Sequence, residues 1–209
     1  MSFMPDKQTT SIATHTNEDI FIRDKSLCED LIGKISFTEM SYFQITGRMP
    51  DPSQVKMLDA CLVTLMEHGL TPSALSSRLI YSSAPEAMQA AVAAGLMGVG
   101  SVFAGTMEGC AELIRRLIDS SEGLEHEADV VASEFYQSKL PLPGFGHHLH
   151  KPDDPRSIRL LLLADELKLT GQWINALKHL SAAVDKRYDK HITINATGAI
   201  AACLGDCGV

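Results

Sequence analysis

Residues 140–155 carry four prolines and three histidines, a composition that predicts a loop between two helical stretches. Within it, Gly144 and Gly146 flank an aromatic residue and precede His147, and Arg156 follows that histidine by nine positions. Glycine lets the backbone approach a ligand closely or adopt a positive φ. Histidine exchanges a proton near neutral pH, and arginine holds a carboxylate by two parallel hydrogen bonds. The segment therefore predicts a proton donor and an anion clamp on one loop.

Beyond residue 24 the chain reads as helices joined by short turns. In residues 53–68, for example, apolar side chains recur at positions 55, 58, 62, 65 and 66, which is helical spacing with one buried face. The predicted helices cover residues 53–68, 72–78, a long segment from 83 that breaks near Gly100, 108–118, 124–138, 157–169, 172–188 and 195–204. No segment shows sustained two-residue alternation, so we expect no sheet and an all-α fold.

The composition limits the class of protein. With 209 residues, 45% apolar and 21% charged, the chain is typical of one globular domain, or of one domain with a smaller lobe. A formal net charge of −8 gives no support to nucleic-acid binding, which usually needs a basic surface. It does not exclude a small phosphate-bearing ligand, which needs only a local basic patch. No apolar run is long enough for a bilayer, and residues 1–25 lack the apolar core of a secretory signal.

Five cysteines are present without the paired spacing of a zinc site. An odd number without such pairs predicts reduced thiols, mostly buried as small apolar side chains, in a cytoplasmic protein. They are Cys28, Cys61, Cys110, Cys203 and Cys207.

Four segments in order resemble the citrate synthase superfamily. The Pro-Gly-Phe-Gly-His run that begins at Pro143, with Asp-Pro-Arg at 154–156, is similar to the family's Pro-Gly-(aromatic)-Gly-His … Asp-Pro-Arg loop. Residues 67–78 resemble the earlier segment that holds the oxo-acid, and residues 94–108 resemble a Gly-rich helix junction. Residues 194–202 resemble the Asn-x-Asp-Gly-Ala-Ile-Ala-Ala run of the short, citryl-CoA lyase-like branch.

The resemblance implies a large helical domain with a smaller helical domain inserted in it. It places an N-terminal arm at residues 1–24, the large domain at 25–105, the small domain at 106–194, and the return to the large domain at 195–209. Family members usually continue for several helices beyond the position of Val209, so the resemblance implies a truncated or divergent short form. The family is built on dimers, and the small-residue segment 87–105 offers a packing face for a homodimer; the alternative is packing within one chain.

The resemblance also implies a reaction. A carboxylate deprotonates an acyl-CoA, one histidine stabilises the enol, and a second histidine protonates the carbonyl of a 2-oxo acid. His147 matches the second histidine, whereas the enol-stabilising histidine falls on Phe103 and the carboxylate falls on Thr197. Phenylalanine cannot exchange a proton, and a threonine hydroxyl is too weak a base for a thioester α-carbon. Phe103 is then expected to line an apolar pocket, and Thr197 to hold a carbonyl or a water.

The candidate site consists of His147 as the catalytic residue with substrate-binding partners around it. The partners are His68, Arg156, Gly144, Gly146, Phe103 and Thr197. Three of them have a structural alternative: His147 can cap a turn, Arg156 can pair at a helix start, and His68 can end a helix. Lys151 is a candidate contact for a CoA phosphate or a solvated loop lysine. Histidines this close in one loop seldom face a single ion, so we expect no metal.

Three functions remain open. The first is an enzyme that makes or cleaves the C–C bond between an acyl-CoA and a 2-oxo (di)carboxylate, as an acyl-CoA transferase of the citrate synthase type or as a citryl-CoA lyase. The second is a catalytically impaired homologue that binds an acyl-CoA or a dicarboxylate. The third is different thioester chemistry on the same fold, such as hydrolysis. In each, the coenzyme A thioester is a substrate or ligand, and no permanent cofactor is expected.

Overall fold

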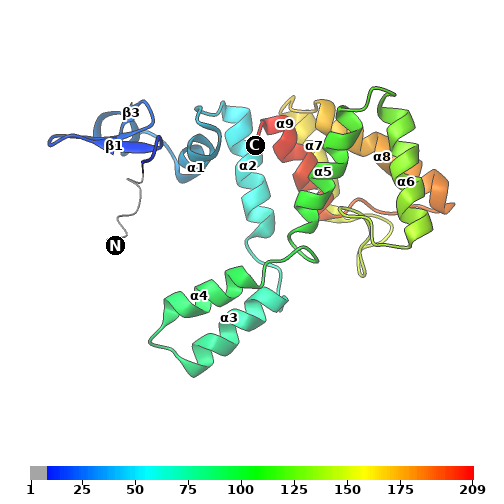
Figure 1. Ribbon diagram of the computed structural model, residues 1–209, viewed down its shortest axis with the longest axis horizontal. Helices are drawn as coiled ribbons and strands as arrows, with labels where there is room; N and C mark the ends of the chain where they lie inside the picture. Colours follow the sequence, from blue (N-terminus) through cyan, green and yellow to red (C-terminus); the bar gives the residue numbers. More distant parts are fainter. Residues whose placement is uncertain (1–8) are drawn as a thin grey trace, which may run out of the picture. The chain divides into compact units, whose positions relative to one another are not determined.

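The computed structural model describes residues 9–209. These divide into two compact units, one of residues 9–55 with Val209 and the other of residues 56–208 (Figure 1). Residues 1–8 of the predicted arm lie outside the described residues. The domain boundaries predicted at residues 105 and 194 fall inside the second unit and stay a prediction.

The first unit begins with a small antiparallel sheet, so the expectation of no sheet was wrong here. Strands β1 (Ala13–His15), β2 (Ile20–Ile22) and β3 (Lys25–Ser26) pair in chain order. Strands of two or three residues are too short to show a repeating alternation. A π-helical turn, η1 (Leu27–Leu31), follows the sheet.

Helix α1 (Phe37–Thr46) is capped at both ends by residues that favour helix termini. Ser36 accepts a hydrogen bond from the backbone N–H of Glu39, and the Glu39 carboxylate accepts one from the Ser36 backbone N–H, which together form a capping box. At the other end Gly47 adopts a φ of 78°, the left-handed conformation that commonly closes a helix.

The second unit is helical, and the all-α prediction is confirmed there. Its helices are α2 (Pro52–Leu65, which starts in the first unit), α3 (Pro72–Ser83), α4 (Met88–Met97), α5 (Thr106–Ile118), α6 (Leu124–Ser138), α7 (Pro155–Glu166), α8 (Gln172–Tyr188) and α9 (Ala196–Cys207). The bounds predicted for α6 and α8 and the break near Gly100 are confirmed. Helix α2 ends at Leu65, three residues earlier than predicted, so His68 lies in a loop.

The core of the second unit forms around α9. This helix packs against α5, α7 and α8, and α6 covers the other side of α8 (Figure 1). Ala199, Ile200 and Ala202 in its middle are fully buried, and small residues here allow the neighbouring helices to approach closely. The first turn of α9 is thereby fixed beside the predicted site loop.

Helices α3 and α4 pack against one another and bury few side chains. Helix α3 has no buried side chain, and α4 buries only Ala91. Large apolar side chains on the pair face solvent in this chain, among them Leu79, Leu96 and Met97. Among the residues that the structure describes, no helix is long and apolar enough to cross a membrane.

Candidate active site

The predicted loop is anchored on the segment that leads into α9. The backbone N–H of Gly146 donates to the Thr193 carbonyl at 2.8 Å, and the Asn195 N–H donates to the Gly144 carbonyl at 3.0 Å. Gly144 has a φ of 83°, and a Cβ there would collide with Cys110 and with the backbone of Gly198. The close approach expected of Gly144 is therefore made to α9. A substrate contact at Gly144 or Gly146 stays a prediction.

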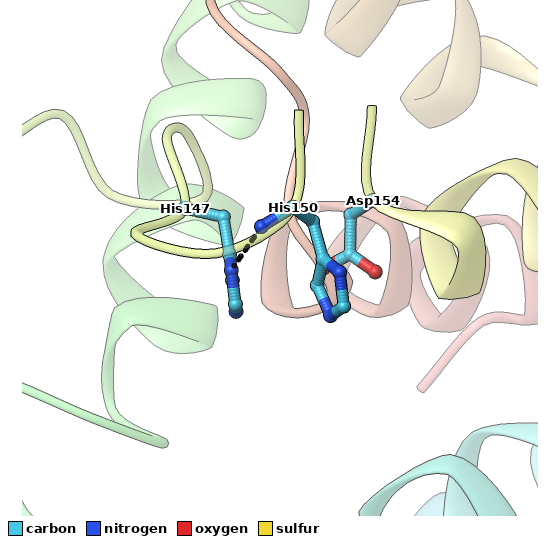
Figure 2. A group of neighbouring side chains, drawn as sticks. All are labelled: His147, His150 and Asp154. Carbon is cyan, nitrogen blue, oxygen red and sulfur yellow. Dashed lines mark hydrogen bonds between the residues drawn. The ribbon is translucent and has the colours of Figure 1, made fainter. Parts of the chain in front are cut away.

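His147 is held by its own loop. Its Nδ1 accepts hydrogen bonds from the backbone N–H groups of Leu149 and His150, both at 3.1 Å, and Figure 2 draws the second of these. Its ring stacks on His148 and on His150, with centroids 4.7 and 4.4 Å away. An Nδ1 that accepts from two donors carries no proton, so these contacts assign the proton of the neutral ring to Nε2.

The surroundings of His147 also favour its neutral form. Burial, followed by the neighbouring charge at His150, lowers its pKa, and the opposite effect of the Asp154 carboxylate does not outweigh them. A neutral imidazole with a proton on Nε2 is a hydrogen-bond donor toward whatever that atom faces. The loop therefore presents His147 as a donor near neutral pH.

Arg156 brings two of the predicted histidines together. Its Nη1 donates to Nδ1 of His68 at 3.2 Å, and its Nη2 lies 3.3 Å from Nε2 of His147. The structure thus gathers residues from the α2–α3 loop, the predicted loop and the start of α7. Their binding of a substrate stays a prediction.

Asp154 is the anion that explains a cation at the start of α7. Its carboxylate accepts from Arg156 Nε at 3.0 Å and from Nη2 at 2.7 Å, and its side chain is completely buried. Burial raises the pKa of Asp154, but the hydrogen bonds and the charge of Arg156 outweigh it and leave the pKa lowered. Sequence reasoning missed this role. The available signal was an aspartate directly before a proline, which is typical of a helix N-cap.

Thr197 and Phe103 lie along one series of hydrogen bonds. The Thr106 hydroxyl is 2.7 Å from the Phe103 carbonyl and 3.0 Å from the Thr197 hydroxyl. Thr197 donates to Asn195 Oδ1 at 2.7 Å, and the Asn195 amide donates to the Gly146 carbonyl beside His147. Phe103 itself is 54% exposed in this chain. Its place in the lining of an apolar pocket stays a prediction.

A metal ion does not suit this loop, although His147, His150 and Asp154 place potential ligand atoms within 4.8 Å of one another (Figure 2). Nδ1 of His147 already accepts from the backbone. Both oxygens of Asp154 accept from Arg156, whose positive charge would repel a cation at this point. Lys151 is exposed on the same loop, and its contact with a CoA phosphate stays a prediction.

His191 connects the C-terminal part of the loop to helix α8. Its Nδ1 is 2.6 Å from an Asp185 oxygen at the end of α8, and its Nε2 is 2.9 Å from an Asp153 oxygen in the loop. Hydrogen bonds to Asp185 and then to Asp153 raise the pKa of His191, because both favour the imidazolium. We call this group the His191 bridge.

Comparison with known proteins agrees with the fold and with the family resemblance. A family model described as the citrate synthase C-terminal domain matches residues 9–209. The chain belongs to the citrate synthase family. The resemblance stated from the motifs is confirmed, including its short, citryl-CoA lyase-like branch. The solved citryl-CoA lyase from Hydrogenobacter thermophilus is similar to this chain with a TM-score of 0.88 and 29% identity. The match covers 97% of this chain and 77% of that one.

Other relatives are larger. The citrate synthase of Synechocystis sp. is 30% identical over 135 residues, which are 64% of this chain and 32% of that protein. The ATP citrate lyase of Methanothrix soehngenii, solved with citrate and coenzyme A, has a TM-score of 0.81 over 98% of this chain and 33% of that one. At 17% identity it shows the fold alone. This citrate synthase family chain spans about a quarter to a third of the curated relatives it matches.

Proposed function

We propose that this chain acts on the C–C bond between an acyl-CoA and a 2-oxo dicarboxylate, as a citrate synthase or a citryl-CoA lyase does. The observation that carries the proposal is the Arg156 guanidinium between His68 and His147. Nε and one side of Nη2 are engaged by Asp154, so the Nη1–Nη2 edge remains for a substrate. A carboxylate on that edge would accept two parallel hydrogen bonds, with a histidine at each side.

His147 supplies the proton in this proposal. Its Nε2–H would donate to the carbonyl oxygen of the 2-oxo acid and stabilise the negative charge that develops there when the new C–C bond forms. Arg156, 3.3 Å from Nε2, adds a positive charge beside the same oxygen. The Nε2–H of His147 and the Nη2 group of Arg156 both donate toward this place. A substrate oxygen that accepts from both would relieve their mutual repulsion.

A second candidate function is suggested by the side chains of Thr197 and Phe103. Neither side chain supplies the base or the enol-stabilising group of the family. The donor set at Arg156 does not depend on them. A homologue that binds a dicarboxylate or acyl-CoA without rapid turnover is therefore our alternative.

The proposal also covers the substrates, the cellular compartment and the oligomeric state of the protein. We expect coenzyme A thioesters as substrates with no permanent cofactor, in keeping with the coenzyme A bound to the ATP citrate lyase of Methanothrix soehngenii. The cysteines of the described residues are all free, which suits a compartment that keeps thiols reduced, such as the cytoplasm. The exposed apolar side chains of α3 and α4 suit a homodimer, whose interface would cover them.

Isothermal calorimetry with oxaloacetate, citrate, coenzyme A and acetyl-CoA, alone and in pairs, tests the proposal. We expect a dicarboxylate to bind and to tighten the binding of the thioester. Dicarboxylate and thioester binding without cleavage of citryl-CoA would favour the second candidate. If none of the ligands binds, both candidate functions are wrong.

A further inference from the structure

A single buried carboxylate joins the anion clamp to helix α9. Besides the two bonds from the Arg156 side chain, Asp154 accepts the Arg156 backbone N–H at 3.0 Å and thereby caps α7. Its second oxygen accepts the backbone N–H of Ala196, in the first turn of α9, at 3.2 Å. Its own N–H donates to the Thr193 hydroxyl at 3.0 Å. All these partners lie in the second unit.

The arrangement determines which edge of the guanidinium is free. An arginine side chain has several rotamers and five N–H groups in a rigid plane, so it holds a ligand well only when its plane is fixed. Asp154 binds the Nε edge, and this directs Nη1 and the remaining Nη2 hydrogen toward His68 and His147. Ala196 precedes Thr197, so the same carboxylate also fixes the turn that carries the family's base position.

Resting on the proposed function, we infer that Asp154 is the positioning residue of this site. It orients Arg156 for the substrate carboxylate and keeps the start of α9 in register with it. Nothing in this role requires Asp154 to touch the substrate, because its oxygens are already occupied by donors of the chain.

Asp154→Asn separates this role from simple capping. Asparagine caps a helix about as well as aspartate, so α7 keeps its start. It offers one acceptor oxygen and no charge, however, and its amide would face the donors of Arg156 or Ala196. We expect citrate or oxaloacetate to bind about 10- to 100-fold more weakly, the usual consequence of losing a hydrogen bond to a charged group.

Asp206→Asn is the matched control. Asp206 is also a helix-capping carboxylate, and it accepts the N–H groups of Gly171, Trp173 and Ile174 at the start of α8. The Asp206 variant is expected to lower thermal stability and to leave the dicarboxylate affinity unchanged. If both variants weaken binding equally, the role of Asp154 is structural and the inference is wrong.

A readout without substrate keeps this inference apart from the proposed function. The Nε–H of Arg156, observed by nuclear magnetic resonance, is expected to be protected from solvent exchange in the wild type and in Asp206→Asn, and exposed in Asp154→Asn. An unprotected Nε–H in the wild type, or unchanged protection in Asp154→Asn, overturns the inference. A wild type that shows the protection but binds no dicarboxylate overturns the proposed function instead, and with it the part of the inference that concerns substrate.

Discussion

The Nη2 atom of Arg156 lies 3.3 Å from Nε2 of His147, so a cation and a neutral hydrogen-bond donor converge on one place. A planar guanidinium presents two parallel donors, which a lysine ammonium cannot reproduce. Replacing Arg156 by lysine is therefore expected to weaken citrate binding by about 10- to 100-fold, measured by calorimetry. The control is Arg159→Lys on the same helix, where the exposed side chain pairs with Glu166. An unchanged affinity in Arg156→Lys would exclude the arginine from the site.

Replacing His147 by glutamine tests the proton donor. Glutamine can donate a hydrogen bond but cannot transfer a proton, so turnover of the productive substrate is expected to fall by about 10²- to 10⁴-fold. The dissociation constant for citrate should change far less, because Arg156 stays in place. His148→Gln is the control, since His148 stacks on the same ring and is exposed. Turnover that survives in His147→Gln contradicts the assignment.

Thr197→Asp is expected to restore a base. The position is in the first turn of α9, where the helix dipole stabilises a carboxylate, and the Thr106 hydroxyl lies 3.0 Å from the Thr197 hydroxyl that the carboxylate would replace. The variant should exchange the methyl protons of acetyl-CoA with solvent at least about 100-fold faster than the wild type. Thr197→Asn, which has the same size and no basic oxygen, should not. A folded Thr197→Asp that binds acetyl-CoA without faster exchange would show that the base position lies elsewhere.

The His191 bridge predicts how stability depends on pH. The pKa of His191 is raised in the folded chain by Asp185 and Asp153, while a histidine in the unfolded chain has a pKa of about 6.5. The stabilisation is therefore complete below about pH 6.5 and is lost as the pH rises through the higher, folded pKa. Because 44% of the His191 side chain is exposed to solvent, we expect this stabilisation to be at most about 1 kcal/mol.

Thermal unfolding of the wild type and of His191→Gln across this pH range measures the bridge. The difference between the two midpoints should be largest in mild acid and should shrink in alkali. The variant keeps the groups that do not contact His191, including His147, so their effects cancel. A difference that grows toward alkaline pH would mean that the imidazolium does not form the bridge.

The exposed apolar side chains of α3 and α4 predict self-association. Leu79 and Leu96 are 70% and 68% exposed in this chain, and a glutamate at either position would bury a charge in an interface. Light scattering should give twice the chain mass of 22.7 kDa for the wild type and the single mass for Leu96→Glu. Leu162→Glu on α7, where the leucine is also about half exposed, is the control. A wild type that is monomeric at every concentration contradicts the homodimer.

The sequence predicted the helices with strong periodicity and the loop with its histidine and arginine. The bounds of α6 and α8 follow from patterns that tertiary contacts do not override. The partner of Arg156 was not predictable in the same way. Asp154 is recognisable as a helix cap from its neighbours in sequence, but its burial and its bond to Ala196 depend on how α7 meets α9. The short strands β1, β2 and β3 were missed because two or three residues carry no period.

Cleavage of citryl-CoA by the purified chain, followed through the oxaloacetate released, decides whether this site is catalytic. We expect release by the wild type that falls by about 10²-fold or more in His147→Gln, with Arg156→Lys impaired through weaker binding. Release that is the same in all three proteins would contradict the assignment of this site. A wild type that binds citryl-CoA and releases nothing would leave this chain as a binding member of the citrate synthase family and contradict its catalytic role.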